Sequence, residues 1–280
     1  MVRILRLQGF RKKAMGRLSL LLVLLLLVNF IVADLGFCEF NLATGKEEAI
    51  FISAEKERKM GEAISRQVEK KMKLDKNYTN QEKVDRIGQK LAMVSDRRDI
   101  IYHFYVIDDE TENAFALPGG YIYIFKGFLE KLETDDEIAA ILAHEIGHVC
   151  AKHSLKRLQN SLGYTVLRLL VVRGAEDPYS RAKGNEAVNQ LMLAHSRADE
   201  TEADKLAAKY LEKAGFDPYA SVDILDKMIK WKMKGPIRAK RYWYTHPYLA
   251  DRRATARKEV TGELSFDDYL NVTKEEEYVF

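Results

Sequence analysis

Residues 144–148 read His-Glu-Ile-Gly-His and lie inside a segment whose apolar residues repeat at helical spacing. Residues 134–137, Thr-Asp-Asp-Glu, form a capping-box pattern that predicts the start of this helix. Two histidines four residues apart on a helix lie on the same side, one turn apart, so His144 and His148 can point at one metal ion. The fold must therefore hold this helix beside another element that completes the set of ligands.

The residues between the two histidines predict the chemistry of the metal. Glu145 lies about 100° round the helix from His144, close enough to reach a water at the metal without being a ligand. This pattern is typical of zinc sites in which the glutamate is a general base. Gly147 costs a helix about 1 kcal/mol relative to alanine, which indicates a close approach by another backbone.

A catalytic zinc ion takes three protein ligands, and the acidic segment 196–204 is the candidate source of the third. Glu200 and Asp204 are four residues apart and face the same way, so one can bind zinc while the other accepts an N–H from a zinc histidine. Glu202 competes for the ligand role, and it points about 160° away from Asp204. Spacing alone leaves both assignments open, together with an ordinary solvated helix face.

The remaining pattern predicts an α+β domain that is mainly helical with a small β-sheet. Strands are expected at residues 102–107 and 121–125, and an irregular stretch at 113–118. Helices are expected at about 53–72, from a capping box at 79, from the capping box at 134, at about 185–214, from 217 and after 247, with a loop at 174–184. The apolar segment 162–172 is too short to span a membrane and favours a core helix, the alternative being a lid or a membrane-touching segment.

The N-terminus predicts a targeting segment over residues 1–38, followed by one domain over 39–280. Six basic residues precede residue 18, and an apolar run then extends from Leu18 to Val32. This order is typical of a secretory signal cut after Ala33 or Cys38, the alternative being an uncleaved membrane anchor. Either one places the body outside the cytoplasm. Residues 39–280 carry 39 basic and 41 acidic residues, which argues against a nucleic-acid partner.

The chain resembles peptidase family M48, which includes HtpX and the CAAX prenyl proteases, over about residues 45–260. The matching patterns occur in family order: Asn113-Ala114-Phe115-Ala116-Leu117-Pro118-Gly119-Gly120, residues 144–148 with Val149 and His153, Ser196-Arg197, Glu200-x-x-Ala203-Asp204, Thr245-His246-Pro247 and Arg252. The resemblance implies a zincin-like (gluzincin) fold with the sheet beside the zinc helix. It also implies Glu200, rather than Glu202, as the third ligand of one zinc ion per chain, with Asp204 behind a histidine.

Further roles are expected near the metal. The resemblance implies that Asn113, Ala114, Phe115 and Ala116 form a strand edge that holds an extended substrate by backbone hydrogen bonds, the alternative being a plain turn before a strand. His246 is expected to donate to the oxyanion of the reaction, oriented by Arg252. The alternatives for His246 are a ligand that keeps the enzyme latent or a turn residue before a proline.

Three other histidines and one cysteine receive no catalytic role. His153 is expected to be an exposed or half-buried helix residue, and His103 and His195 to be structural. Cys150 is expected to be a small core residue.

Together these patterns predict a zinc-dependent endopeptidase of the periplasm or cell envelope that hydrolyses unfolded or mis-assembled proteins. Its partners are expected to be extended polypeptides, with membrane association through the N-terminal segment. The alternatives are a zinc-containing chaperone or assembly factor with little proteolysis, and a membrane-anchored processing protease with a narrow substrate.

Overall fold

The computed structural model describes residues 38–173, 177–234, 242–264 and 268. Residues 1–37, which carry nearly all of the predicted targeting segment, lie outside this part, so that segment stays a prediction. Within the described residues, no helix has the length and apolar character needed to cross a membrane. The chain divides into one unit of Met1–Glu39 and Glu47–Ser53 and a second of Phe40–Lys46 and Ala54–Phe280.

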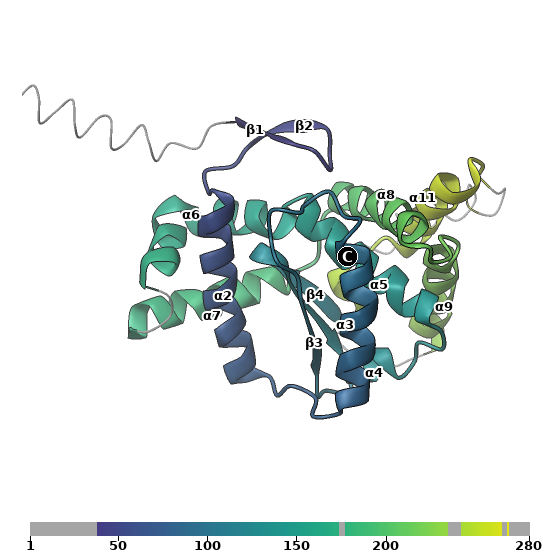
Figure 1. Cartoon of the computed structure of the whole chain (residues 1–280), viewed down its shortest axis with the longest axis horizontal. Coiled ribbons are helices and arrows are strands. Elements are labelled where there is room, and N and C mark those ends of the chain that lie inside the picture. Colours follow the sequence, from purple (N-terminus) through teal and green to yellow (C-terminus); the bar gives the residue numbers. More distant parts are fainter. Residues whose placement is uncertain (1–37, 174–176, 235–241, 265–267, 269–280) are drawn as a thin grey trace, which may run out of the picture. The chain divides into compact units, whose positions relative to one another are not determined.

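Two sheets occur in the described chain. Strands β1 (Cys38–Asn41) and β2 (Lys46–Ala49) form a two-stranded sheet. In the second unit, β3 (His103–Ile107), β4 (Ala114–Leu117) and β5 (Tyr121–Phe125) pair in the order β3-β5-β4, with β3 parallel and β4 antiparallel to β5. Strand β4 therefore lies at one edge of this sheet (Figure 1).

The prediction of an irregular stretch at residues 113–118 is wrong for Ala114–Leu117. These residues pair with β5 from Ala114↔Ile124 to Leu117↔Tyr121. All four residues of β4 are buried, so the strand lacks the alternation of buried and exposed residues by which strands are recognised. The strands expected at 102–107 and 121–125 are confirmed as β3 and β5.

The two faces of the three-stranded sheet differ in chemistry. Ile122 and Ile124 of β5 lie in the main hydrophobic core. Tyr121 and Tyr123 alternate with them on the opposite face, where the Tyr123 ring stacks on Tyr105 and its hydroxyl hydrogen-bonds Ser65 of α2 at 2.8 Å. Helix α2 therefore covers the aromatic face.

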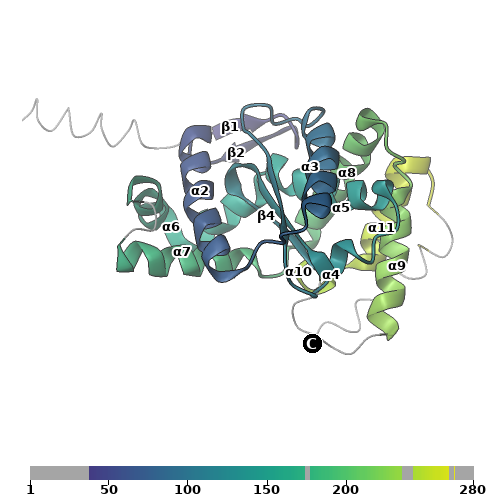
Figure 2. The same ribbon diagram turned by 60° about the horizontal axis from the view of Figure 1, so that its bottom comes forward.

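Helices make up most of the described chain, which confirms the expected mainly helical α+β class (Figures 1 and 2). They are α2 (Ala54–Lys71), α3 (Tyr78–Ala92), α4 (Lys126–Leu129), α5 (Asp135–Cys150), α6 (His153–Arg173), α7 (Pro178–Leu191), α8 (Arg197–Ala214), α9 (Ala220–Lys234), α10 (Tyr242–Thr245) and α11 (Leu249–Thr261), with the 3-10 turn η1 (Pro118–Gly120) between β4 and β5.

Several predicted helix boundaries are wrong because other side chains cap the helices. Helix α3 begins at Tyr78, where Asn77 accepts the N–H of Thr79. The single helix expected at 185–214 is two helices, and the loop expected at 174–184 ends where α7 begins at Pro178. Asp177 caps α7, and Ser196 with Asp199 forms a capping box that starts α8 anew.

The segment 162–172 is helical, as predicted, but only one side of it is buried. Leu167 and Leu170 are buried, whereas Val172 is 74% exposed. Gly163, with φ of 72°, interrupts the regular helix within α6. The segment is therefore an amphipathic helix rather than a fully buried one.

Helix α5 lies in the middle of the second unit and positions the site. It packs against α3, α8 and α9 and against β4, and Glu137–Cys150 are buried throughout. Thr134 caps its start by accepting the N–H of Glu137, as predicted. A Cβ atom at Gly147 would lie 2.8 Å from the carbonyl oxygen of Ala203, so the predicted close approach is confirmed and its partner is α8.

Candidate metal centre

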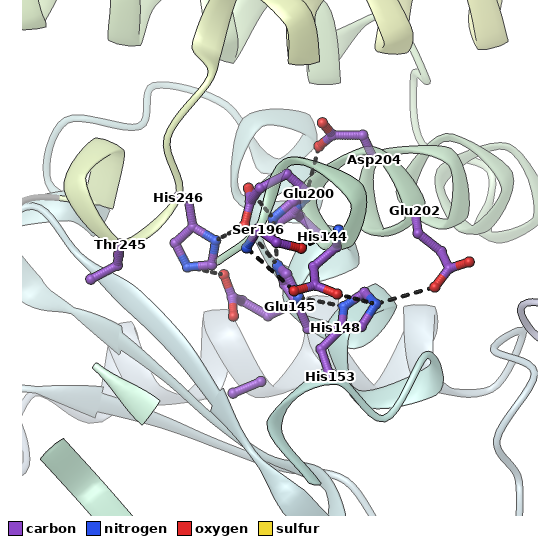
Figure 3. Close-up of polar contacts among 12 residues, drawn as sticks. His144, Glu145, His148, His153, Ser196, Glu200, Glu202, Asp204, Thr245 and His246 are labelled. Atoms are coloured by element: carbon purple, nitrogen blue, oxygen red, sulfur yellow. Dashed lines mark hydrogen bonds and ion pairs between the residues drawn. The ribbon is translucent and has the colours of Figure 1, made fainter. Parts of the chain in front are cut away.

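Four buried side chains converge where α5, α8 and the segment after α10 meet (Figure 3). His144 and His148 extend from α5, Glu200 from α8, and His246 follows α10. One nitrogen or oxygen of each lies within 4.8 Å of those of the other three. The Nε2 atoms of His144 and His148 are 3.0 Å apart, and the two carboxylate oxygens of Glu200 lie 3.4 Å from them, Oε2 from His144 and Oε1 from His148.

Two local features bring Glu200 to the histidines. The capping box of Ser196 and Asp199 starts α8 immediately before it, so Glu200 stands in the first turn. The missing side chain at Gly147 then lets the backbone of α8 approach α5 at Ala203. The helix–helix contact thus fixes which carboxylate faces the two imidazoles.

The charge states of Glu200 and His148 fit a cation. At His144, burial and Arg252 lower the pKa, but Asp204 outweighs them and raises it to about 9, so a cation would have to displace a proton there. Burial alone raises the pKa of Glu200, but His246 and Arg252 outweigh it and hold the pKa well below its usual range, so the carboxylate is ionised. Burial and the neighbouring His195 lower the pKa of His148 well below its usual range, so this imidazole is neutral. Ionised carboxylate and neutral imidazole are the forms that bind zinc.

Asp204 and Arg252 lie behind His144. Oδ1 of Asp204 is 2.8 Å from Nδ1 of His144, and Arg252 donates to both carboxylate oxygens of Asp204 at 2.9 Å. Burial raises the pKa of Asp204, but Arg252 and His144 outweigh burial and hold the pKa below its usual value, so the carboxylate is ionised. Arg252 also lies 3.0 Å from Oε2 of Glu200, and it donates to the backbone carbonyl of His246 at 3.3 Å.

The carboxylate of Glu145 is held at one oxygen and free at the other. Its Oε1 accepts from the hydroxyl of Tyr242 at 3.1 Å and lies 3.5 Å from Nε2 of His246. Its Oε2 is buried and has no hydrogen-bond partner among the described residues. One oxygen of Glu145 is therefore available to accept a proton.

His246 lies between the two glutamates. Its Nδ1 is 3.0 Å from Oε1 of Glu200, and its ring stacks on the fully buried ring of Tyr242, with centroids 4.2 Å apart. Tyr242 was not among the predicted site residues. The available signal was its position four residues before His246, one helical turn away, and the N–H of His246 indeed donates to the carbonyl of Tyr242.

His153 is only 3% exposed, so the expectation of an exposed or half-buried residue is wrong. Its Nδ1 lies 2.8 Å from Nδ1 of His148, and its Nε2 lies 3.2 Å from Oε2 of Glu202. Hydrogen bonding from His153 lowers the pKa of Glu202 to about 2 although burial opposes the shift. Helical periodicity carries no signal of this contact, because α5 and α6 are separate helices with a break at Lys152, which has a φ of 56°.

His195 is also close to the centre. Its ring centroid is 4.0 Å from that of His148 and 5.0 Å from that of His246, and its backbone N–H donates to the carbonyl of Thr245. His103 instead stacks on Tyr121 in the sheet. Cys150 is fully buried, which confirms the expected core residue.

The expected substrate edge lies next to the zinc helix, since β4 packs against α5. Ala114, Phe115 and Ala116 belong to β4, and Asn113 immediately precedes it. The Asn113 side chain accepts from the N–H of Ala114 and from the hydroxyl of Thr245, the residue before His246. The edge and the histidine segment are thus tied together.

Known proteins resemble this chain over the same region. Residues 78–260 match the sequence model of Peptidase family M48. The mitochondrial metalloendopeptidase OMA1 of Schizosaccharomyces pombe is 33% identical over 146 residues, which cover 52% of this chain and 43% of that protein. The beta-barrel assembly-enhancing protease of Escherichia coli is 25% identical over 215 residues, which cover 74% of this chain and 44% of that protein. The chain therefore spans less than half the length of these relatives.

The family match covers the helix with both histidines, the segment with Glu200 and the segment with His246, and the donor set formed by these residues is able to bind a metal. On this basis, the chain belongs to peptidase family M48, whose members are zinc metallopeptidases.

Proposed function

We propose that this protein is an endopeptidase that binds one zinc ion through His144, His148 and Glu200. The observation that carries the proposal is the cluster of buried donor atoms within 4.8 Å, beside a glutamate with one unpartnered oxygen. Two imidazoles and one carboxylate form a known set of ligands for catalytic zinc. When bound, zinc polarises a carbonyl and makes water acidic enough to lose a proton near neutral pH.

The proposed general base is Glu145. Tyr242 holds Oε1 of this carboxylate, which orients the free Oε2 to take the proton of the attacking water. The same oxygen then carries the proton to the amine that leaves when the peptide bond breaks. Asp204, 2.8 Å from Nδ1 of His144, accepts the proton on that nitrogen and leaves the Nε2 lone pair for the metal.

For His246 we propose the role of oxyanion donor. Its Nε2 is buried and has no hydrogen-bond partner among the described residues, so this nitrogen can donate to a substrate oxygen when it carries a proton in addition to the one on Nδ1, which faces Glu200. The alternative is a ligand that keeps the enzyme latent, because His246 belongs to the same donor cluster as Glu200. The two roles predict opposite changes in activity when the histidine is removed.

The proposed substrates are unfolded or mis-assembled proteins of the cell envelope. An extended chain would add to the edge of β4 by backbone hydrogen bonds, which make little demand on side chains. Similarity to a protein named beta-barrel assembly-enhancing protease supports this choice, and the N-terminal segment predicts an extracytoplasmic location, with or without a membrane anchor. A structural zinc site in a chaperone would need no base such as Glu145.

The proposal is tested by incubating the purified protein with unfolded casein and mapping the cuts. We expect cleavage at several sites, loss of cleavage with a zinc chelator and recovery when zinc is restored. The matched variant is Glu145→Gln, which should still bind zinc and fold. Its turnover rate should fall about 10²–10⁴-fold, because a carboxamide cannot accept the proton.

Cleavage that survives both the chelator and Glu145→Gln would exclude the proposed mechanism. Equal suppression of casein aggregation by the wild type and by Glu145→Gln, without cleavage, would identify a chaperone. Cleavage at a single site would instead favour a processing protease with a narrow substrate.

A further inference from the structure

The two histidines of α5 differ in what lies behind them. Nδ1 of His144 faces a carboxylate directly, that of Asp204 at 2.8 Å. Nδ1 of His148 faces another imidazole, that of His153, also at 2.8 Å. All three rings are at least 97% buried, so water does not replace these contacts. The partner of a metal-binding histidine fixes its tautomer and ring direction, so His153 affects how His148 binds a metal.

The positions of the ring protons of His148 and His153 follow from the distance between the two rings. Only one proton can lie between two Nδ1 atoms at 2.8 Å, so one ring donates and the other accepts. Nε2 of His148 is the atom that faces His144 and Glu200. For this Nε2 to keep its lone pair for a metal, the proton of His148 must be on Nδ1, and Nδ1 of His153 must be the acceptor.

The neighbours of Nε2 of His153 favour this arrangement of protons. An accepting Nδ1 requires the proton of a neutral His153 on Nε2, and this atom lies 3.2 Å from Oε2 of Glu202 and 3.4 Å from Oδ1 of Asp199. Both carboxylates accept such a proton. Lys46, 2.7 Å from the other oxygen of Glu202, holds that carboxylate in place.

We infer that His153 is a positioning residue that holds His148 in its metal-binding tautomer, with Glu202 fixing the proton of His153. This inference rests on the proposed zinc site. Residues two apart on a helix point about 160° apart, so Asp204 and Glu202 leave α8 in different directions (Figure 3). Asp204 reaches its histidine directly, whereas Glu202 reaches His148 through the ring of His153. Helix α8 thus supplies the acceptor behind both histidines of α5.

The test measures zinc affinity by competition with a chromophoric chelator and the visible absorption of the Co²⁺-substituted protein, which reports the ligand geometry. His153→Leu removes the acceptor, and we expect zinc to bind about 10–100-fold more weakly with a changed Co²⁺ spectrum. His153→Asn keeps an oxygen acceptor near the place of Nδ1 and should restore most of the affinity. Glu202→Ala should weaken zinc binding by about 10-fold.

The matched control is His103→Leu, which removes a half-buried imidazole that stacks on Tyr121 in the sheet. It should leave both the zinc affinity and the Co²⁺ spectrum unchanged. Thermal unfolding of the zinc-free variants separates a positioning role from a structural one. If His153→Leu fails to fold, His153→Asn and Glu202→Ala decide the question.

Wild-type affinity in His153→Leu, or an asparagine variant as weak as the leucine variant, would overturn the inference. A loss of affinity matched by an equal loss of stability in the zinc-free protein would do the same. Failure of the zinc site itself is distinguishable, because the wild type would then bind no zinc and Glu200→Ala would change nothing.

Discussion

The hydroxyl of Tyr242 donates a 3.1 Å hydrogen bond to Oε1 of Glu145, and both residues are buried. Tyr242 comes from the short helix α10, about a hundred residues after the zinc helix. Its ring also stacks on His246, so one side chain contacts both residues that we propose as catalytic. The bond restrains the carboxylate and leaves Oε2 as the oxygen that accepts a proton.

Tyr242→Phe removes this hydrogen bond and keeps the ring on His246. We expect kcat to fall about 10-fold with zinc content unchanged, since hydrogen bonds to charged groups contribute about 1.5–3 kcal/mol and part of that orients the base. Steady-state kinetics on a quenched peptide measures the effect. An unchanged kcat would mean that Glu145 is oriented without Tyr242.

Glu200→Ala should weaken zinc binding about 100-fold or more, because zinc binding worth about 10–16 kcal/mol is shared among three protein ligands and a water. The control is Glu212→Ala, which removes an exposed carboxylate from the same helix α8 and should bind zinc normally. Metal analysis after dialysis against a weak chelator compares the two. Equal zinc content in both variants would reject Glu200 as a ligand.

His246→Ala distinguishes the proposed roles of this histidine, because the roles predict opposite changes in activity. As an oxyanion donor, its removal should lower kcat by about 10²–10³ with little change in zinc affinity. As a latency ligand, its removal should raise the activity on unfolded substrate, because the open metal position becomes free. We expect the loss, measured per zinc-loaded molecule on a quenched peptide; a gain would establish latency.

Gly147→Ala should destabilise the protein even though alanine is the better helix former by about 1 kcal/mol. The new Cβ would lie 2.8 Å from the carbonyl oxygen of Ala203, a backbone atom that cannot rotate away. Overpacking of this kind costs about 1–3 kcal/mol, and separating α8 from α5 would also weaken zinc binding. Denaturant unfolding with and without zinc measures both effects, and equal or greater stability would contradict the packing argument.

Local chemistry explains which features could be predicted from sequence. His144 and His148 lie on one side of a helix because four residues make about one turn, and this holds whatever surrounds the helix. The strands at β3 and β5 follow from dense runs of β-branched and aromatic residues. Strand β4 could not be predicted in this way, because Ala114–Leu117 are buried on both faces and owe their conformation to pairing with β5.

The zinc helix, its two histidines and the glutamate between them could be predicted from residue spacing, because they depend on helical repeat alone. Spacing left Glu200 and Glu202 as alternatives, and only the tertiary structure brought Glu200 to the histidines, through the contact of α5 with α8 at Gly147 and Ala203. The contact of His153 with His148 crosses a helix break, and the contact of Tyr242 with Glu145 joins segments far apart in the chain, so helical periodicity carries no information about either. They depend on how whole helices pack, and that is decided by the sum of many side-chain contacts rather than by any local pattern.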